Sequence, residues 1–243
     1  MTDLALRLRS LHRAWRLRLR SDRVQIRCIL SHLREGDLAV DVGSHKGGFT
    51  YWMRRAVGAS GTVYAFEPQP QSAAYQRRVL QALGFDNVRV EALALSSSRG
   101  SATFSARPGG FHPGGRLEAG GAADGEVSYP VATETLDHYL RERPRPVALV
   151  KIDAEGHEAE IFRGARRILS DDRPLLIFEC ERHRQAMRSA RPIFEPLLEL
   201  GYRGHFIHGS RLRGLSEFDE RRHQVGDRPE VNNFVFYPPT SSG

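Results

Sequence analysis

Residues 41–48, DVGSHKGG, combine an acid with closely spaced glycines directly after an apolar run. An acid at a strand end, followed by glycines that open a helix, lets a ligand approach the backbone and its free N–H groups. Both a dinucleotide and S-adenosylmethionine suit such a turn. A dinucleotide requires glycine at the third position of G-x-G-x-x-G, where this sequence has His45. The spacing therefore favours a cofactor without phosphates.

A second acid, Glu67, follows the apolar run 62–66, about twenty residues after the glycine turn. A carboxylate at the end of a second strand accepts hydrogen bonds from both ribose hydroxyls of a nucleoside. Pro68 makes the turn after it rigid. Ala92 and Leu93 end a third apolar run and are suited to flank an adenine ring.

Residues 151–158, KIDAEGHE, put ionisable side chains at the carboxyl end of an apolar run, the edge where open α/β sheets bind ligands. The helix dipole explains the glutamates that open the next helix, but it does not explain Asp153, Glu155 and His157. Histidine has an ordinary pKa near working pH, which suits a general base. We therefore predict that His157 is the catalytic base and that Asp153 orients a substrate or the cofactor. Glu179, at the next strand end, is a further catalytic candidate.

A metal ion at this edge is an alternative that stays open. Asp153, Glu155, His157 and Glu179 offer oxygen and nitrogen ligands of the kind that Mg²⁺ and other divalent ions bind. No compact ligand motif such as H-E-x-x-H occurs, so we predict no metal site.

Short apolar runs alternate with helical stretches from residue 37 onward, which predicts βαβ units and a mainly parallel sheet. The predicted strands are 38–42, 62–67, 88–93, 147–153, 175–179, 204–207 and 233–237. The predicted helices are 48–57, 70–83, 158–169 and 193–200. Residues 107–125 are rich in Gly and Pro, which predicts a mobile loop or a short β excursion.

We predict a helical extension at residues 1–36 and a single cofactor-binding domain at residues 37–243. The extension repeats large apolar residues at helical spacing, with arginines between them: Leu4, Leu8, Leu11, Trp15 and Leu19. The simplest interpretation is a helix that caps the domain. A homodimer contact, a lid over the substrate and a basic helix on a membrane surface are the alternatives.

The composition is that of a globular protein, with 40% hydrophobic and 27% charged residues in 243. Two cysteines, Cys28 and Cys180, imply no disulfide framework and indicate the cytoplasm as the location. We find no secretory signal and no apolar run long enough to cross a bilayer. The net charge is +7, yet zinc-finger and RNP motifs are absent, so we expect no nucleic-acid partner.

Five stretches resemble FkbM-family methyltransferases: DVGSHKGGFTYW, FEPQP, ALALSSSRG, VKIDAEGHEAEIFRGA and NNFVFYP. The resemblance covers residues 37–238. It implies an α/β class I methyltransferase fold, a Rossmann-like, mainly parallel seven-stranded sheet with helices on both faces and a reversed final strand. It also implies S-adenosyl-L-methionine as the cofactor and methyl transfer to a hydroxyl oxygen of a small molecule, such as a sugar or polyketide in natural product biosynthesis.

In the resemblance, Asp41, Gly43 and Glu67 match cofactor positions and residues 153–158 match the signature block. The full predicted cofactor-binding set is Asp41, Gly43, Ser44, Lys46, Gly48, Phe49, Thr50, Glu67, Pro68, Ala92, Leu93, Asp153 and Glu155. Two alternatives remain: a nicotinamide-dependent oxidoreductase and a non-catalytic module with this fold that binds a partner or RNA. The acceptor is not determined by the motifs.

Overall fold

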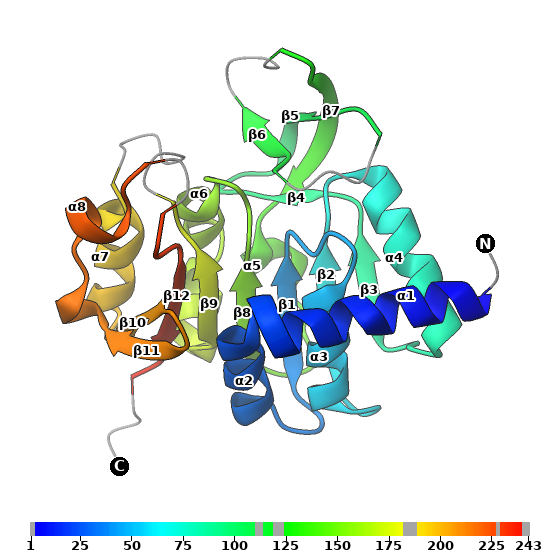
Figure 1. Ribbon diagram of the computed structural model, residues 1–243, viewed down its shortest axis with the longest axis horizontal. Coiled ribbons are helices and arrows are strands. Elements are labelled where there is room, and N and C mark those ends of the chain that lie inside the picture. The colour runs from blue at the N-terminus through cyan, green and yellow to red at the C-terminus, as the bar shows by residue number, and fades with distance from the viewer. Residues whose placement is uncertain (1–2, 110–113, 119–123, 182–188, 227–228, 240–243) are drawn as a thin grey trace.

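The computed structural model describes residues 3–109, 114–118, 124–181, 189–226 and 229–239. Its centre is an eight-stranded sheet with the order β11-β10-β12-β9-β8-β1-β2-β3 (Figure 1). The five parallel strands are β1 (Leu38–Val42), β2 (Thr62–Phe66), β3 (Val88–Glu91), β8 (Val147–Ile152) and β9 (Leu175–Glu179). This order puts β1 and β8 in the middle, where both are covered on both faces.

The reversed final strand is confirmed. β12 (Asn233–Tyr237) runs antiparallel to β9 on one side and to β10 (Arg203–His208) on the other. The edge strand β11 (Arg211–Gly214) pairs antiparallel with β10 and adds an eighth strand that we did not predict. β11 is only four residues long, and its side chains are half-buried or exposed. Its sequence therefore has too few apolar residues to show the alternation that predicts a strand.

Alternate side chains of each strand enter different cores. Tyr64 and Phe66 pack on one face with α5 (Leu136–Tyr139), α6 (Glu158–Arg163), η2 (Ile168–Asp172) and α7 (Arg191–Glu199). Val63 and Ala65 pack on the other face, toward α2 (Arg23–His32), α3 (Gly48–Val57) and α4 (Pro70–Leu83). Two-sided burial explains why β1 and β8 are continuous apolar runs and not alternating ones.

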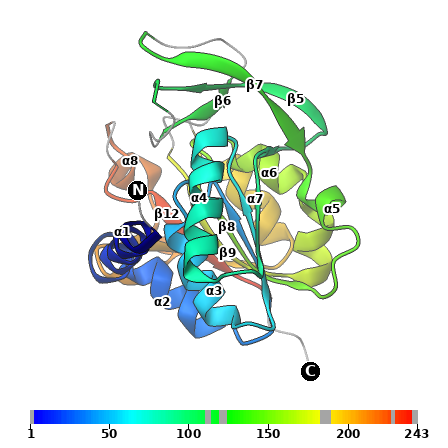
Figure 2. The ribbon, with the colours of Figure 1, turned by 90° about the vertical axis from the view of Figure 1, so that its right-hand side faces the viewer.

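Residues 3–32 are helical, as predicted, but in three pieces. α1 (Asp3–Arg16) leads into a π-helical turn η1 (Leu17–Ser21), and α2 follows. Figures 1 and 2 show α1 along the outside of the layer that holds α3 and α4. Trp52 of α3 donates its indole N–H to the carbonyl of Ala14 at 2.9 Å, which anchors α1. A domain boundary at residue 36 stays a prediction.

A second, four-stranded sheet rises above the carboxyl ends of the central strands (Figures 1 and 2). It consists of β4 (Ala94–Leu95), β5 (Gly100–Ala106), β6 (Arg116–Glu118) and β7 (Val127–Glu134), in the order β4-β7-β5-β6. The β excursion predicted within 107–125 is present as β6, while residues 110–113 and 119–123 lie outside the described residues. We did not predict β5 and β7, because β5 is built mostly of small residues without a clear strand pattern.

Two predicted elements are shorter than expected. The helix predicted at 158–169 ends at Arg163 with Gly164 as its C-cap, and a Cβ at Gly164 would lie 2.0 Å from the carbonyl oxygen of Ser96. The chain resumes as the π-helical turn η2. The strand predicted at 88–93 ends at Glu91, which leaves Ala92 and Leu93 in the loop beyond it.

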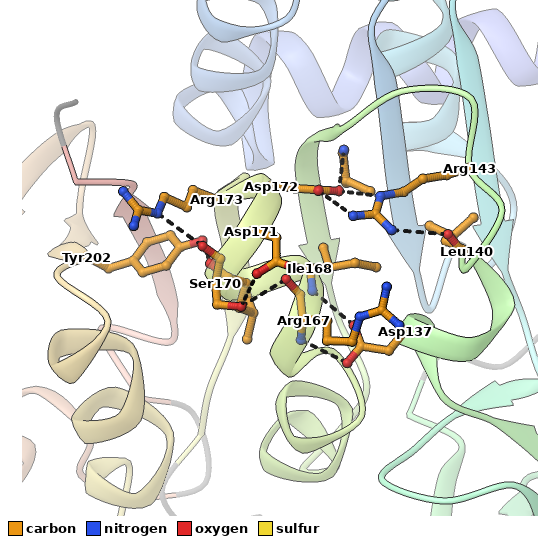
Figure 3. A network of polar contacts seen from close by, with 12 residues as sticks. Asp137, Leu140, Arg143, Arg167, Ile168, Ser170, Asp171, Asp172, Arg173 and Tyr202 are labelled. Carbon is orange, nitrogen blue, oxygen red and sulfur yellow. Dashed lines mark hydrogen bonds and ion pairs between the residues drawn. The ribbon is translucent and has the colours of Figure 1, made fainter.

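A polar network holds the amino end of β8, opposite the carboxyl edge (Figure 3). The carboxylate of Asp172 in η2 accepts hydrogen bonds from the guanidinium of Arg143, at 2.5 and 2.6 Å, and from the backbone N–H of Val147 at 2.8 Å. Asp137 accepts from the backbone N–H groups of Arg167 and Ile168. These bonds fix the start of β8 and therefore the position of the residues at its far end.

The helices of the described ranges are too short or too polar to span a membrane. α7 begins at Arg191 and not at residue 193, while α8 (Glu220–His223) and the 3₁₀ turn η4 (Leu215–Glu217) complete the described helical elements.

Candidate active site

A cavity with roughly 700 Å³ of empty space lies between the carboxyl ends of β1, β2 and β8 and the small sheet. Its lining includes seven residues that the sequence singled out: Gly43, Glu67, Pro68, Leu93, Asp153, Glu155 and His157. Phe104 of β5 and Leu117 of β6 form part of the wall. The small sheet therefore supplies apolar surface to the cavity that the motifs did not reveal.

Gly43 directly follows β1 and lies against the backbone of Asp153, the residue after β8. Its φ is +71°, and a Cβ at this position would lie 1.8 Å from the carbonyl oxygen of Asp153. Both the backbone conformation and the lack of space require glycine. The N–H groups of Gly43 and Ser44 both donate to the carbonyl of Phe66, at 2.9 and 3.1 Å, so the turn is also joined to β2.

Glu67 lines the cavity although its side chain is only 3% exposed. One carboxylate oxygen accepts from the backbone N–H of His45 at 2.7 Å and the other accepts from that of Gln69 at 2.9 Å. Burial raises the pKa of Glu67 to about 7, and these two hydrogen bonds offset part of the rise. His45 has a left-handed φ of +47°, which aims its N–H at the acid.

Asp41, Ser44 and Thr50 lie beneath the turn and do not line the cavity. The hydroxyl of Thr50 donates to Asp41 at 2.5 Å, and Gln76 of α4 donates to that same hydroxyl oxygen at 2.8 Å. Ser44 donates to the side-chain oxygen of Gln76 at 2.8 Å. Burial raises the pKa of Asp41. These side chains join the glycine turn, α3 and α4 in one buried polar network.

Lys151, on β8, is a buried cation that we did not predict as a site residue. Its ammonium lies 3.3 Å from a carboxylate oxygen of Asp153 and 4.4 Å from the ring centre of Phe49. Burial opposes its charge, but Asp153, Asp41 and Glu179 together raise its pKa above the ordinary value. A lysine inside an apolar run was the sequence feature that could have indicated it.

His157 lines the cavity, and its Nε2 lies 2.9 Å from the hydroxyl oxygen of Ser96. Burial lowers the pKa of this imidazole, so it is neutral at neutral pH and able to accept a proton. The loop before it is shaped by Glu158, whose carboxylate accepts from the backbone N–H groups of Ala154 and Gly156, at 3.3 and 3.1 Å. That contact gives this signature glutamate a structural role.

Glu179 does not line the cavity. Its carboxylate accepts from the side-chain amide of Asn232 at 2.7 Å. Burial first, and then the nearby charges of Asp153, Glu181 and Glu155, raise its pKa to about 9. A protonated carboxyl one strand away from His157 is a poor base, so its predicted catalytic role lacks support from the geometry.

The remaining predicted residues also lie outside the cavity lining. Gly48 opens α3, and a Cβ there would meet the side chain of Leu17 at 2.3 Å, so its small size serves packing against η1. Phe49 lies against Lys151, and Lys46 and Ala92 are elsewhere on the turn and loop. Cofactor contact by these residues stays a prediction.

Across the described ranges, no group of three or more His, Cys, Asp and Glu side chains is arranged to hold a metal ion. Asp153, Glu155 and His157 share the cavity wall, yet Asp153 faces the ammonium of Lys151 and His157 faces Ser96. The described geometry therefore offers the magnesium alternative no ligand set.

Comparison with known proteins identifies one family. The sequence profile described as the methyltransferase FkbM domain matches residues 41–203, which include the glycine turn, Glu67 and the signature block. A hexuronic acid methyltransferase, AglP, from Haloferax volcanii is 29% identical over 168 residues, or 67% of this chain and 64% of the relative. A protein-L-isoaspartate O-methyltransferase from Methanocella arvoryzae is 42% identical over 67 residues, or 28% of this chain and 36% of the relative.

Among solved structures, a methyltransferase FkbM from Methylobacillus flagellatus KT superposes with a TM-score of 0.55 at 14% identity. The match covers 96% of this chain and 55% of that chain. The chain thus spans between about a third and two thirds of the length of these relatives. With the strand order described above, this likeness identifies the class I S-adenosylmethionine-dependent methyltransferase fold.

Proposed function

This chain belongs to the methyltransferase FkbM domain family, and from that premise we propose that it transfers a methyl group from S-adenosylmethionine to a hydroxyl oxygen of a small molecule. The proposed acceptor class is a sugar, a polyketide or a related natural product. The observation that carries the proposal is Glu67, a buried carboxylate at the end of β2 that faces the cavity beside the glycine turn.

The residues of the cavity fit this cofactor. Each oxygen of Glu67 accepts one backbone N–H, which leaves a lone pair on each for a ribose hydroxyl. Leu93, Phe104 and Leu117 offer an apolar wall suited to an adenine ring. Asp153 directly follows β8 and lines the cavity, where its carboxylate suits the positive charge of an amino group or a sulfonium. We propose Glu67, Asp153 and the backbone of the glycine turn as the cofactor's main contacts.

When bound, S-adenosylmethionine supplies a methyl group that is already electrophilic. The protein's task is to align the acceptor oxygen, exclude water and take up the hydroxyl proton. We assign the proton to His157, because this imidazole lines the cavity and its lowered pKa keeps it neutral. The ammonium of Lys151, 3.3 Å from the carboxylate of Asp153, holds that carboxylate in place.

The names of two relatives differ in acceptor, one a hexuronic acid and the other a protein isoaspartate. The match to the hexuronic acid methyltransferase covers 67% of this chain, against 28% for the other. The longer match therefore relates a larger part of this chain to the sugar-directed enzyme. It supports a sugar-type acceptor over a protein acceptor.

Calorimetry with S-adenosylhomocysteine, the demethylated cofactor, tests the proposed cofactor. We expect saturable binding by the wild type and at least about a tenfold weaker binding by Glu67→Ala. Glu91→Ala is the matched control, since Glu91 ends the neighbouring strand β3 and does not line the cavity. Absence of wild-type binding at millimolar ligand, or binding of NADH in its place, refutes the proposal. Mass spectrometry of glycans and metabolites from a deletion strain then identifies the acceptor as the compound short of one methyl group.

A separate test addresses His157. We expect His157→Ala to lower turnover by about 10²- to 10⁴-fold while it leaves the affinity for S-adenosylhomocysteine unchanged. In the wild type, turnover should rise with pH through a pKa below the ordinary histidine value. Ser96→Ala keeps the imidazole and removes only its hydroxyl partner, so a smaller loss is expected. Undiminished turnover in His157→Ala rejects the role.

A further inference from the structure

α1 and η1 carry apolar side chains on two opposite sides. On the inner side, Leu6 is 1% exposed and packs against Val79 and Ala82 of α4. On the outer side, four large apolar residues recur at helical spacing and stay in contact with solvent. We call them the Leu/Trp stripe: Leu4 (65% exposed), Leu8 (59%), Trp15 (45%) and Leu19 (65%). Packing against the domain therefore explains only the inner side.

The Leu/Trp stripe is concentrated on one element. Within the described ranges, only eight large apolar side chains are strongly exposed, and half of them lie in this stripe. Figures 1 and 2 show that α1 runs along the outside of α3 and α4, so its outer side faces away from the body of the domain. A contiguous exposed apolar strip of this kind marks an interaction surface.

The charge around the stripe indicates which kind of partner binds this surface. Residues 3–21 hold six arginines and one acid, Asp3, so they carry +5 of the chain's net +7, although Arg7 and Arg13 contact α4 on the inner side. Arg16 and Arg20 are exposed beside the stripe, and Arg18 lies 5.3 Å from the ring centre of Trp15, at the edge of the same face. Leucines and a tryptophan flanked by arginines are the pattern of a helix that lies in the plane of an anionic lipid surface.

We propose that the outer face of α1 and η1 binds an anionic membrane surface, with the Leu/Trp stripe in the acyl boundary and the flanking arginines on lipid phosphates. The helix would lie flat, because its inner side remains packed on α3 and α4 through Ala14, Trp52 and Leu6. A lipid surface accounts for the apolar stripe and for the arginines together. A nucleic acid leaves the leucines unexplained, and a second copy of this helix brings like charges together.

The binding test uses flotation with vesicles of phosphatidylcholine alone and of phosphatidylcholine mixed with phosphatidylglycerol. We expect the wild type to float with the anionic vesicles only, and less so at high salt. The triple variant Leu4→Ser, Leu8→Ser, Leu19→Ser should weaken binding by at least about a hundredfold. Arg16→Glu with Arg20→Glu should weaken it by about tenfold. Trp15 is retained, since its ring also packs on Trp52 at 5.2 Å.

Matched controls remove the same chemistry from another face. The apolar control removes three exposed side chains: Leu198→Ser in α7, Leu200→Ser at its C-cap and Val225→Ser in a later loop. Arg166→Glu and Arg211→Glu reverse exposed charges far along the chain. Both controls should bind vesicles as the wild type does. Melting curves and S-adenosylhomocysteine binding of every variant verify that it is folded.

Three outcomes overturn the proposal. The first is a folded wild type that does not float with anionic vesicles. The second is a serine triple variant that binds them as tightly as the wild type, since the arginines alone would then account for binding. The third is a wild-type dimer in sedimentation that the triple variant converts to a monomer, because a second copy would then cover the stripe. The proposal does not depend on the methyl acceptor.

Discussion

At the scale of single residues, the site depends on groups whose environment changes their chemistry. Glu67 is held by two backbone N–H groups and by burial, which raises its pKa to about 7. Burial lowers the pKa of His157. Shifted pKa values in one cavity, upward for the acid and downward for the proposed base, are typical of functional sites. Gly43 contributes by having no side chain at all.

The affinity for S-adenosylhomocysteine should depend on the ionisation of Glu67. Ribose hydroxyls donate to the carboxylate, so binding favours the ionised form and should strengthen as pH rises through about 7. Glu67→Gln keeps the shape but cannot ionise. We expect this variant to bind about 10- to 100-fold more weakly at about pH 8, with little change between about pH 6 and about pH 8. Calorimetry at both pH values measures this, and an unchanged pH dependence in Glu67→Gln contradicts it.

Gly43→Ala should be far more damaging than an alanine at a comparable glycine. Gly43 and Gly84 have nearly the same φ, +71° and +69°, but a Cβ at Gly84 meets nothing within 4 Å. Gly84→Ala therefore costs only the left-handed backbone, about 1–2 kcal/mol. Gly43→Ala adds a clash with the carbonyl of Asp153, and we expect a loss above about 3 kcal/mol in urea unfolding. Equal losses in the two variants would mean that the turn moves freely away from β8.

At the scale of elements, the polar network beneath the turn connects three of them. Asp41 lies in β1, Thr50 in α3 and Gln76 in α4, and each depends on the next for its hydrogen bond. The network sets the position of the glycine turn relative to both helices. It also explains why polar residues at 0% exposure persist inside an otherwise apolar layer.

Removing members of the network should be costly and non-additive. Thr50→Val takes the donor away from the buried carboxylate of Asp41, with an expected loss of about 1–3 kcal/mol. Gln76→Leu should cost a similar amount. Since Gln76 acts partly through Thr50, the double variant should differ from the sum of the single variants by about 0.5–3 kcal/mol. Urea unfolding of the four proteins measures this coupling, and strict additivity would show that the contacts are independent.

At the scale of the whole molecule, the central sheet gathers ionisable groups at one edge, while α1 and η1 together carry +5 of the net charge of +7. Asp41 and Glu67 are buried and Glu179 is half-buried, and all three carboxyls have a raised pKa. A carboxyl of this kind binds its proton more tightly in the folded state. Stability therefore falls as pH rises from the unfolded pKa through the folded one.

Glu179 should make the largest resolvable contribution to this trend. Its pKa rises from 4.5 to about 9, so its ionisation opposes folding increasingly between those two values. Glu179→Gln mimics the protonated form and can still accept from Asn232. We expect a flatter decline in melting temperature between about pH 6 and about pH 9 than in the wild type. Glu195→Gln, at an exposed position of α7, is the control; a wild-type slope in Glu179→Gln would argue against a buried proton.

Local sequence was sufficient to predict most strands and helices of the central domain. Apolar runs and helical stretches alternate, so the strands and their mainly parallel class were predictable, while the reversed final strand was expected only from the resemblance to the FkbM family. The places of Gly43 in the turn after β1 and of Glu67 at the end of β2 were predictable as well, because both depend on neighbours in the chain. The edge strand β11 and the small sheet were not, since short strands of small residues lack periodicity.

Only the tertiary structure decided how deep each side chain lies and what it contacts. Asp41 and Thr50 lie below the cavity because Gln76, from a different helix, completes their network. In the folded chain Lys151 forms an ion pair with Asp153, and Phe104 of the small sheet lines the cavity. The sequence of α1 alone does not show which of its apolar sides is buried and which is exposed. Packing on α4 covers one side and leaves the Leu/Trp stripe outside, because burial depends on segments far apart in the chain.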